Sequence, residues 1–420
     1  MNKSILIISY VFPPYPGIGS RRWVKFAKYL TKKGYEIHVI CAKNPGKATS
    51  QWIDDVQNER IKIYPIDVFY PKIFSFTNYS KSIFNRIAFR FWTLFFKLFS
   101  KGVIYDRSLF WKKPFLRKAQ AIISEYKINN VIVTIPPFRL AHHALSLLTF
   151  NKNLNLIVDY RDPWTDNTTF QGFENLSSCR LNYEKKIERE VLQKSNYIIS
   201  TSEQMTTWAK EKLNSNKEKC ITICNGYDND DIVRFTNNRK NEKKILISAG
   251  NLYGNLEYLL VPFVKFIQRK EQQEKKFSDK YGFEFYGEIY PSYYSLLKDN
   301  NIKSVSFNGF ISRKDLNKKY NRADFFLMFT VNDFAFAFNT KFYEYLAYQK
   351  PIIHFSNDGA VTQFLETNQL GLGIKPTSFE QDMERLFDLI EKENLNYNNT
   401  FDSSSFSLEN LTKKVEQLFI

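Results

Sequence analysis

Cysteine and histidine are scarce in this chain, whose 420 residues include only four of each. So few cysteines exclude a disulfide framework in a protein of this length and indicate a reducing compartment. Cys220 and Cys224 have no second pair of ligands at a zinc-binding spacing, and the adjacent His142 and His143 also lack partners in the sequence. We therefore expect no bound metal ion.

Long apolar runs are also missing. The most apolar stretch, 89–99, is interrupted by Arg90 and Lys97, whereas a membrane-spanning helix needs about 20 apolar residues. The apolar run near the N-terminus is short and meets Pro13-Pro14, without the small-residue cleavage pattern of a signal peptide. We interpret the chain as cytoplasmic, with peripheral attachment to the inner face of the cell membrane left open.

Acidic residues are almost absent from one part of the chain. The net charge is +17, and all of it lies in residues 1–200, which hold 31 basic and 14 acidic side chains against 29 of each in 201–420. The segment 81–118 has ten basic residues and a single acid, Asp106. Such a field indicates an anionic partner, either nucleic acid, an anionic membrane surface or a phosphorylated substrate. A merely solvated basic surface is the alternative.

Strand and helix patterns alternate along the rest of the sequence. Residues 4–10 form the continuous apolar run of a buried parallel strand, 11–20 a Pro/Gly loop and 21–33 an amphipathic helix that Gly34 stops, before a strand at 35–41. Further strands are predicted at 130–135, 154–159, 197–201 and 219–224, and helices at 112–127, 139–150 and 181–194. After a polar linker at 236–243, a second series has strands at 244–249, 282–286, 305–308, 325–330 and 351–354. The pattern predicts two doubly wound α/β domains.

Ligands of open parallel sheets bind beyond the carboxyl ends of the strands, so the loops there are the candidate sites. The first loop contains Gly17 and Gly19 and leads into Arg21 and Arg22. Glycines let the backbone approach a ligand, and a helix N-terminus attracts an anion. The loop lacks the dinucleotide-binding fingerprint, because Arg22 occupies the third glycine position. An ordinary turn is the alternative interpretation.

A second loop, Asp159-Tyr160-Arg161-Asp162, follows another apolar strand. Buried charges cost several kcal/mol unless they are paired, so a structural ion pair between Arg161 and an aspartate is one interpretation. The other is that a carboxylate orients a hydroxyl or a sugar. His142, one turn into the helix after the strand at 130–135, is either a ligand for an anion or hydroxyl or a simple surface histidine.

In the second half, Gly250 and Asn251 follow the strand at 244–249, and a later helix is entered through Lys341 with Glu344 three residues on. Residues at this spacing share a helix face and are able to pair with each other. At the mouth of a cleft, the lysine would bind a phosphate and the glutamate would bind a pair of vicinal hydroxyls. These are the two polar parts of a nucleotide ribose diphosphate.

With these residues in view, the chain resembles the family-4-like retaining glycosyltransferases of the GT-B fold along nearly its whole length. The landmarks of the resemblance are Pro13-Pro14 with Gly17 and Gly19, Asp159 to Trp164, Asn225-Gly226-Tyr227-Asp228, Gly250 to Gly254, Asn308-Gly309-Phe310, Ala323-Asp324 and Lys341 to Pro351. The resemblance implies two facing Rossmann-like domains: an acceptor-side domain at 1–225 and a nucleotide-sugar domain at 226–402. It also implies a helix at 403–420 that crosses back to the first domain.

The resemblance further implies a reaction. A sugar would pass from a UDP- or GDP-type nucleotide-sugar, with retained configuration and without a metal or other bound cofactor. The acceptor would be a glycan or a lipid-linked sugar in cell-surface polysaccharide assembly, of the lipopolysaccharide or capsule kind. No nucleic-acid partner is expected, because the sequence has no helix-turn-helix, zinc module or RNA-binding signature.

The roles carried over by position concern both halves of the chain. Glu344 would bind the donor ribose, Gly17 and Gly19 would turn backbone amides to the diphosphate, and Phe310 would border the base. Lys341 and Asp162 are the catalytic candidates, for leaving-group charge and acceptor orientation respectively. The remaining donor candidates are Arg21, Gly250 and Asn251, and the remaining acceptor candidates are Arg161 and His142.

Two departures from the family motif concern the donor. Phe336 stands where the family has the first glutamate of Glu-x(7)-Glu, and Asn251 and Asn255 lie where it has an Arg and Lys pair. Lys341, Arg21 or Arg22 would then supply the phosphate-binding charge. A degenerate transferase fold that acts as a scaffold is therefore an alternative, and a basic nucleic-acid-binding protein is another.

The basic segment up to Lys118 is also rich in aromatic residues. Its Phe and Trp side chains between 84 and 111 alternate with Lys and Arg, as in an interfacial helix on anionic lipid. The alternative is an internal helix whose aromatic side chains belong to the core.

Overall fold

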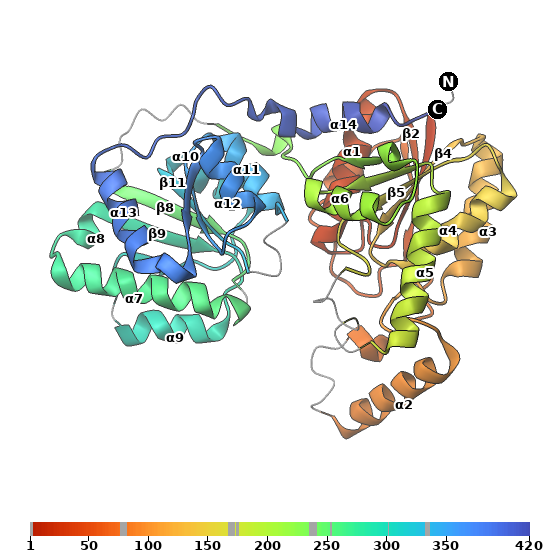
Figure 1. Cartoon of the computed structure of the whole chain (residues 1–420), viewed down its shortest axis with the longest axis horizontal. Coiled ribbons are helices and arrows are strands. Elements are labelled where there is room, and N and C mark those ends of the chain that lie inside the picture. Colours follow the sequence, from red (N-terminus) through yellow and green to blue (C-terminus); the bar gives the residue numbers. More distant parts are fainter. Residues whose placement is uncertain are drawn as a thin grey trace. The chain divides into compact units, whose positions relative to one another are not determined.

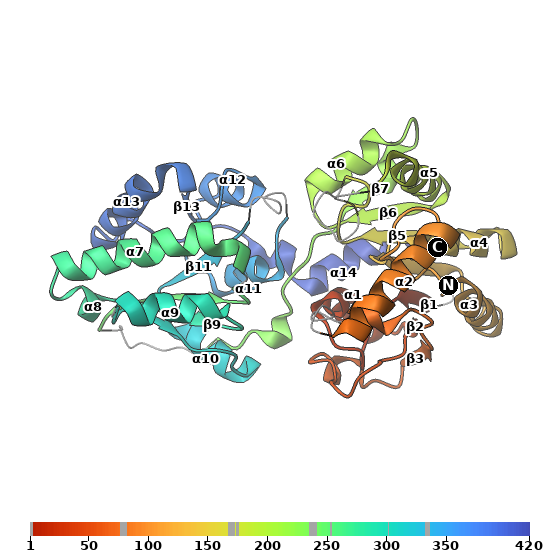
Figure 2. The same cartoon turned by 90° about the horizontal axis from the view of Figure 1, so that it is seen from below.

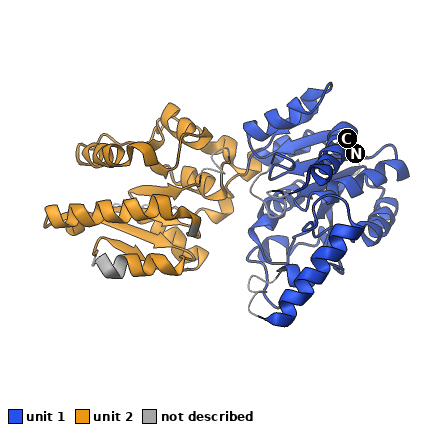
Figure 3. Cartoon of the chain, turned by 60° about the horizontal axis from the view of Figure 1, so that its bottom comes forward, with its two compact units in different colours: residues 1–224, 411–420 blue, residues 225–410 orange. Residues whose placement is uncertain are grey.

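The computed structural model describes residues 3–75, 82–166, 173, 176–234, 242–252, 254–300, 302–331 and 337–420. Most of the predicted linker at 236–243, and Phe336 of the altered family motif, lie outside these residues. The chain divides into two compact units, one of residues 1–224 with 411–420 and one of residues 225–410 (Figure 3). We call them unit 1 and unit 2.

Unit 1 is built on a parallel sheet of seven strands in the order β3-β2-β1-β4-β5-β6-β7. The strands are β1 (Ser4–Ser9), β2 (Glu36–Ala42), β3 (Ile61–Ile66), β4 (Asn130–Ile135), β5 (Asn155–Tyr160), β6 (Tyr197–Ser200) and β7 (Cys220–Thr222). All six residues of β1 are buried, and Ile5 lies in register between Ile37 of β2 and Asn130 of β4. The apolar run at the N-terminus is therefore the centre of the sheet.

Helices cover both faces of this sheet (Figures 1 and 2). Those of unit 1 are α1 (Arg21–Lys32), α2 (Ile83–Phe99), α3 (Lys112–Tyr126), α4 (Arg139–Phe150), α5 (Ser178–Lys194) and α6 (Glu203–Glu211). Helices α3, α4 and α5 lie side by side on one face, while α1 lies on the other. Helix α1 ends as its sequence predicts: Gly34 has a φ of 87°, and its N–H donates to Thr31 O at 2.9 Å.

Unit 2 repeats the architecture with six parallel strands in the order β10-β9-β8-β11-β12-β13. These are β8 (Lys244–Ala249), β9 (Tyr281–Tyr286), β10 (Val305–Phe307), β11 (Phe325–Phe329), β12 (Ile352–Phe355) and β13 (Gly371–Ile374). The helices are α7 (Glu257–Gln273), α8 (Phe277–Lys280), α9 (Pro291–Asn300), α10 (Arg313–Arg322), α11 (Thr340–Tyr348), α12 (Ala360–Thr367) and α13 (Phe379–Glu391). Phe263 of α7 and Phe387 of α13 share one buried cluster with Phe283 of β9, and α10, α11 and α12 lie on the opposite face of the sheet (Figure 1).

The last helix, α14 (Leu408–Glu416), runs across the boundary between the units, and residues 411–420 belong to unit 1. The backbone carbonyl of Leu418 accepts a hydrogen bond from Asn155 Nδ2 at 2.6 Å, and Lys33 Nζ contacts Glu416 Oε2 at 2.5 Å. Residues 411–420 thus belong to the same compact unit as the N-terminal part of the chain.

The predicted fold class, two doubly wound α/β domains with parallel sheets, is confirmed. Strands β3 and β13 were not predicted. Both lie at a sheet edge, where one side of a strand lacks a neighbour, and neither has a continuous apolar run: β3 contains Lys62 and Pro65, and β13 contains two glycines. Among the described residues, no helix combines the length and apolar content needed to cross a membrane.

Candidate functional site

Three loops of unit 2 run together beyond the carboxyl ends of β8, β9 and β10. The N–H of Gly250 donates to Tyr286 O, and that of Gly287 to Gly309 O, both at 2.8 Å. Gly250 and Gly309 have φ angles of 142° and 67°, and a Cβ placed on either would meet no atom within 4 Å. These two glycines therefore leave an open strip of backbone that a ligand can approach closely.

Helix α11 has a capped N-terminus and is hydrogen-bonded to the end of β8, from which this strip begins. Its N-terminus is capped by Asn339, whose side chain accepts from the N–H of Phe342 at 2.9 Å. The hydroxyl of Tyr345 accepts from the N–H of Ala249, the last residue of β8, at 2.8 Å. The second turn of α11 thus contacts the end of a central strand, and Lys341 lies four residues before the residue that makes this contact.

Glu344 is the centre of a charged cluster at this place. It is only 2% exposed. Its Oε2 accepts from Lys341 Nζ and its Oε1 from Arg313 Nη1, both at 2.9 Å, and Arg313 Nη2 lies 3.4 Å from Asp231 Oδ2. The side chains of Lys341 and Arg313 are 28% and 31% exposed, so a buried carboxylate holds two half-exposed cations.

The charge of Arg313 is strongly favoured here. Burial lowers the pKa of its guanidinium, but Glu344 and Asp231 raise that pKa more, and the net shift is upward. The sequence interpretation did not include Arg313. The signal for it lies in its position, because it opens α10 three residues after Phe310, in the first turn of a helix capped by Ser312.

The other donor candidates of unit 2 lie near the same loops. Phe310 is 78% exposed, and no other large apolar side chain of unit 2 among the described residues is as exposed. Asn251 pairs with Glu288, whose N–H donates to Asn251 Oδ1 at 3.2 Å. Lys341, Glu344, Gly250 and Phe310 are thus all on strand-end loops or the helix that packs against them.

In unit 1, the loop after β1 is fixed by Arg161. The guanidinium of Arg161 donates to the carbonyl of Gly19, to Ile135 O at 3.1 Å and to Pro136 O at 2.7 Å. A Cβ on Gly19 would lie 2.6 Å from Arg161 Nη1, so a larger residue there would displace this guanidinium. Gly17, with a φ of 139°, is exposed. Arg161 therefore joins the loops that follow β1, β4 and β5.

The expectation that Arg21 or Arg22 offers charge to a phosphate is not supported by their positions. Arg21 is 2% exposed, and its guanidinium lies 5.7 Å from the ring centroid of Trp52. Arg22 forms a buried ion pair with Asp159 at 3.0 Å and donates to Ile223 O at 2.6 Å. Both side chains are therefore buried in unit 1, Arg22 on a carboxylate and backbone carbonyls and Arg21 against the Trp52 ring.

Asp159 is accordingly a structural residue. It is completely buried and also accepts from Trp23 Nε1 at 2.7 Å and Thr134 Oγ1 at 2.9 Å. The predicted structural ion pair between Arg161 and an aspartate is not found among the described residues; Asp159 pairs with Arg22, and Arg161 donates to backbone carbonyls instead.

Asp162 and His142 are placed differently from each other. Asp162 is half-buried, burial raises the pKa of its carboxyl group, and no hydrogen bond to that group is found within the described part of the chain. His142 Nε2 lies 3.3 Å from Glu190 Oε2, where α4 packs on α5. His142 does not line the cavity described next, and its position is that of a helix–helix contact.

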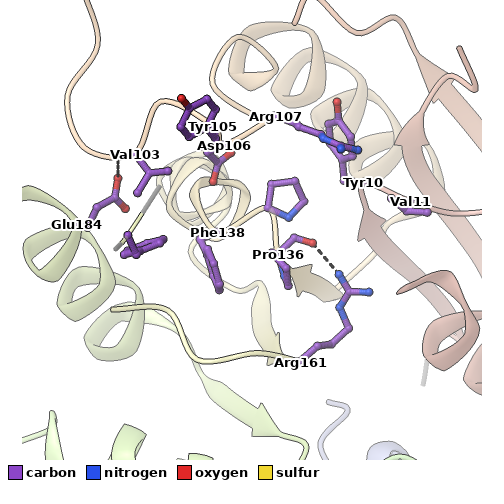
Figure 4. Close-up of a pocket in the computed structure, with 12 residues that line it drawn as sticks. Tyr10, Val11, Val103, Tyr105, Asp106, Arg107, Pro136, Phe138, Arg161 and Glu184 are labelled. Carbon is purple, nitrogen blue, oxygen red and sulfur yellow. Dashed lines mark hydrogen bonds between the residues drawn. The ribbon is translucent and has the colours of Figure 1, made fainter. Parts of the chain in front are cut away.

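Unit 1 contains a cavity of about 310 Å³ at the ends of its central strands (Figure 4). This volume is at the lower end of the range for small-molecule pockets. The walls come from the loops after β1, β4 and β5 and from the segment 103–107. The residues that line it include Tyr10, Val103, Asp106, Arg107, Phe138 and Arg161.

Buried hydrogen bonds hold one wall of this cavity. Glu184 of α5 is 1% exposed and accepts from the N–H of Val103 at 2.7 Å and from Trp164 Nε1 at 3.0 Å. Burial raises the pKa of its carboxyl group, although Arg139 and these donors oppose the shift. Asp106 accepts from the N–H of Arg139 at 2.9 Å. The cavity is therefore walled by a rigid network, with Arg107 exposed at its rim.

The aromatic segment is only partly core. Of the residues of α2, only Phe96 is buried, whereas Phe84 is 84% exposed and Phe91 60%. The interpretation of this helix as wholly internal is therefore wrong. In the described part of the chain, no group of three His, Cys, Asp or Glu side chains is arranged to hold a metal ion.

No family model and no curated protein matches this sequence. Solved structures do match its fold. A sucrose-phosphate synthase from Thermosynechococcus elongatus is 13% identical with a TM-score of 0.65, covering 99% of this chain and 98% of that one. WaaG, a glycosyltransferase involved in lipopolysaccharide biosynthesis, is 12% identical with a TM-score of 0.57, covering 99% of both chains. The lipopolysaccharide outer core galactosyltransferase WaaB is 11% identical with a TM-score of 0.60, covering 99% and 98%. At these identities the likeness establishes the GT-B type of fold, which hosts more than one activity.

Proposed function

We propose that the chain is a glycosyltransferase that uses a UDP- or GDP-type nucleotide-sugar and transfers the sugar with retained configuration, without a metal ion. Its acceptor would be a glycan or lipid-linked sugar in the assembly of a cell-surface polysaccharide. The observation that carries the proposal is the charged cluster of unit 2, where buried Glu344 holds Lys341 and Arg313 beside an open glycine strip.

The chemistry that this cluster suits is departure of a nucleoside diphosphate. Negative charge builds on the diphosphate as the bond to the sugar breaks, and fixed cations placed there lower the barrier. Lys341 and Arg313 provide two such cations, and the N-terminus of α11 provides the positive end of a helix dipole. In this proposal the two side chains do the work of a metal ion.

The rest of the donor would extend along the same loops. Gly250 and Gly309 would let the diphosphate approach the backbone, exposed Phe310 would stack on the base, and Glu344 would accept from the ribose hydroxyls. The role of Gly17 and Gly19 toward the diphosphate stays a prediction. The cavity of unit 1 is the proposed acceptor site, with Arg107 facing an acceptor phosphate or sugar. Asp162 does not line the cavity but follows the lining residue Arg161 in the chain, and its role in orienting the acceptor hydroxyl stays a prediction.

Binding measurements with UDP, GDP and inorganic pyrophosphate test the donor site. We expect one nucleotide to raise the unfolding temperature of the wild-type protein and Lys341→Ala to weaken that nucleotide and pyrophosphate alike. If Glu344 contacts the ribose, Glu344→Gln weakens the nucleotide more than pyrophosphate. If Glu344 only positions the two cations, Glu344→Gln weakens the binding of nucleotide and of pyrophosphate equally. No response of the wild-type protein to any nucleotide contradicts the proposal.

A degenerate transferase fold acting as a scaffold is the second candidate. It is favoured by the contact between Lys341 and Glu344, since the two groups already satisfy each other at 2.9 Å. Hydrolysis of a nucleotide-sugar in the absence of acceptor distinguishes the two, because a scaffold has no hydrolytic activity that Lys341→Ala can remove.

A further inference from the structure

Helix α2 has one face that packs on unit 1. The centroid of the Phe96 ring lies 5.7 Å from the ring centroid of Tyr70, 5.6 Å from that of Phe74 and 5.5 Å from that of Phe110. The Phe89 ring lies 5.3 Å from Phe74. These contacts account for the buried side of the helix, where residues recur every three or four positions.

The opposite face of α2 is also apolar, and it is exposed. Its residues recur at spacings of three and four and lie within about one quarter of the helix circumference. They are Phe84 (84% exposed), Ile87 (60%), Phe91 (60%), Leu94 (58%) and Leu98 (68%). We call these five side chains the apolar stripe. Scattered exposed apolar residues are normal, but a continuous row on one helix marks a surface that meets another apolar phase.

Basic residues border the apolar stripe. Arg86, Arg90 and Lys97 are exposed along one of its edges, and α2 contains no acidic residue. An apolar row flanked by Lys and Arg is the pattern of a helix that lies in the plane of a membrane surface, with the aliphatic stems of the cations passing up to the lipid phosphates.

The helix is fixed to the body of unit 1 at its C-terminal end. Arg180 of α5 donates to Lys97 O at 2.5 Å, to Ser100 O at 2.9 Å and to Gly102 O at 2.6 Å. These bonds satisfy carbonyls that the end of a helix leaves unpaired. Figure 1 shows α2 as an outlying helix of unit 1, away from the sheet. The apolar stripe is therefore held in one orientation.

We propose that the apolar stripe of α2 docks on an anionic lipid surface, with Arg86, Arg90 and Lys97 facing the lipid phosphates. The charge of the helix decides between lipid and a second copy of this chain as the occupant. In a pair of α2 helices the three cations would face other cations, and neither helix has an acid to neutralise them. An anionic bilayer complements both the apolar row and the charge.

The C-terminal end of α2 is close in the chain to the cavity of unit 1. Val103, which lines the cavity, is four residues beyond Phe99, a separation of at most about 14 Å in an extended chain. A membrane docked through α2 would thus place the polar head of a lipid near the cavity rim at Arg107. This link to a lipid-linked acceptor rests on the proposed function, but docking itself does not.

Sedimentation of the full-length protein with vesicles tests the docking. We expect binding to vesicles of phosphatidylcholine with phosphatidylglycerol, weaker binding to pure phosphatidylcholine, and loss of the difference at high salt. The double variant Phe91→Ser/Leu94→Ser should bind at least about tenfold more weakly, since both side chains would leave the lipid phase. The matched control is Phe150→Ser, an exposed aromatic residue of α4 in the same unit.

The charge contribution needs its own variant. Arg86→Gln/Arg90→Gln should weaken binding to anionic vesicles by roughly 25-fold, because each basic residue at such a surface contributes roughly a factor of five. Lys185→Gln/Lys186→Gln on α5 removes the same charge from unit 1 and should change binding little. Unfolding temperatures near that of the wild type establish that all variants fold.

Three results would overturn the proposal: equal binding to both kinds of vesicle, binding that survives Phe91→Ser/Leu94→Ser, or a dimer in sedimentation velocity that this double variant dissociates. Nucleotide binding measured on the same variants separates this proposal from the proposed function. If a variant of α2 loses vesicle binding and keeps nucleotide binding, the result concerns docking through α2 and not the donor site of unit 2.

Discussion

The two units place charged residues at the same topological position and use them differently. In unit 1, the charges at the carboxyl ends of the strands point inward, and the side chains of Arg22 and Asp159 are 4% and 0% exposed. In unit 2, Arg313 and Lys341 remain 31% and 28% exposed around a buried glutamate. Position at a strand end therefore marks where charges gather, whereas burial decides whether they hold loops together or face a ligand.

The difference has an energetic basis. A fully buried pair must be satisfied by protein groups, and Arg22 and Asp159 each have several such partners. In unit 2, the buried carboxylate of Glu344 fixes the positions of Arg313 and Lys341. Because these two cations are partly exposed, their charge is still able to attract an anion from the solvent. The predictions below separate these two uses of charge.

The largest effect should come from breaking the buried pair of unit 1. We expect Asp159→Ala to lower the free energy of unfolding by about 3–5 kcal/mol, because it leaves Arg22 buried without its carboxylate. Denaturant unfolding measures this loss. The control is Asp67→Ala, whose 68% exposed carboxylate pairs with Lys43, and it should cost no more than about 1 kcal/mol. Similar losses in both variants would contradict the structural role of Asp159.

Next in size is the effect of Lys341 on turnover. We expect Lys341→Ala to lower turnover at saturating donor by at least about 100-fold, as for removal of one group that stabilises transition-state charge. Lys318→Ala, which removes a 57% exposed lysine paired with Asp315, serves as the control. Turnover near that of the wild type would remove Lys341 from this role.

A smaller effect concerns pH and a buried histidine of unit 2. Burial lowers the pKa of His354 to about 3, while its ring nitrogens lie 2.9 Å from Thr362 Oγ1 and 3.0 Å from Thr330 Oγ1. Because the unfolded chain binds a proton near pH 6.5 and the folded chain does not, stability is complete above pH 6.5 and falls as the pH drops toward 3. Between pH 6.5 and 5.5 the loss should be about 1 kcal/mol.

Unfolding temperatures of the wild type and His354→Gln across this pH range give the measurement. The variant should lose less stability on acidification than the wild type. In unit 1, burial lowers the pKa of His143 to about 4, so the corresponding loss there should end at a higher pH. A wild-type slope that His354→Gln leaves unchanged would assign the pH dependence to other groups.

The smallest effect is expected at the returning C-terminal segment. Lys33 and Glu416 are 30% and 31% exposed, and Lys33 lowers the pKa of the Glu416 carboxyl group despite partial burial. Lys33→Ala should therefore cost no more than about 1 kcal/mol of unfolding free energy above pH 4.5, and less as the pH falls below it. A loss of several kcal/mol of unfolding free energy would mean that the contact between Lys33 and Glu416, and not apolar packing, holds the segment in place.

Most of the fold could be read from local patterns. Continuous apolar runs identified central strands such as β1 and β4, and helical spacing with a terminal glycine identified α1. The edge strands β3 and β13 were missed because neither has a continuous apolar run, whereas the edge strands β7 and β10 were predicted. Among site residues, spacing brought Lys341 and Glu344 together, but no local pattern could show that Arg313 meets Glu344, because the two are 31 residues apart.

The sequence by itself determined the order of strands and helices, the two parallel sheets and the concentration of positive charge in the first half, since these follow from residue periodicity and composition. Only the tertiary structure decided which charges meet. It buried Arg21 and Arg22, paired Asp159 with Arg22, gathered Arg313 and Lys341 on Glu344, and left one apolar face of α2 exposed. Such contacts depend on how distant segments pack, and burial sets the cost of each charge, so no local stretch of sequence contains that information.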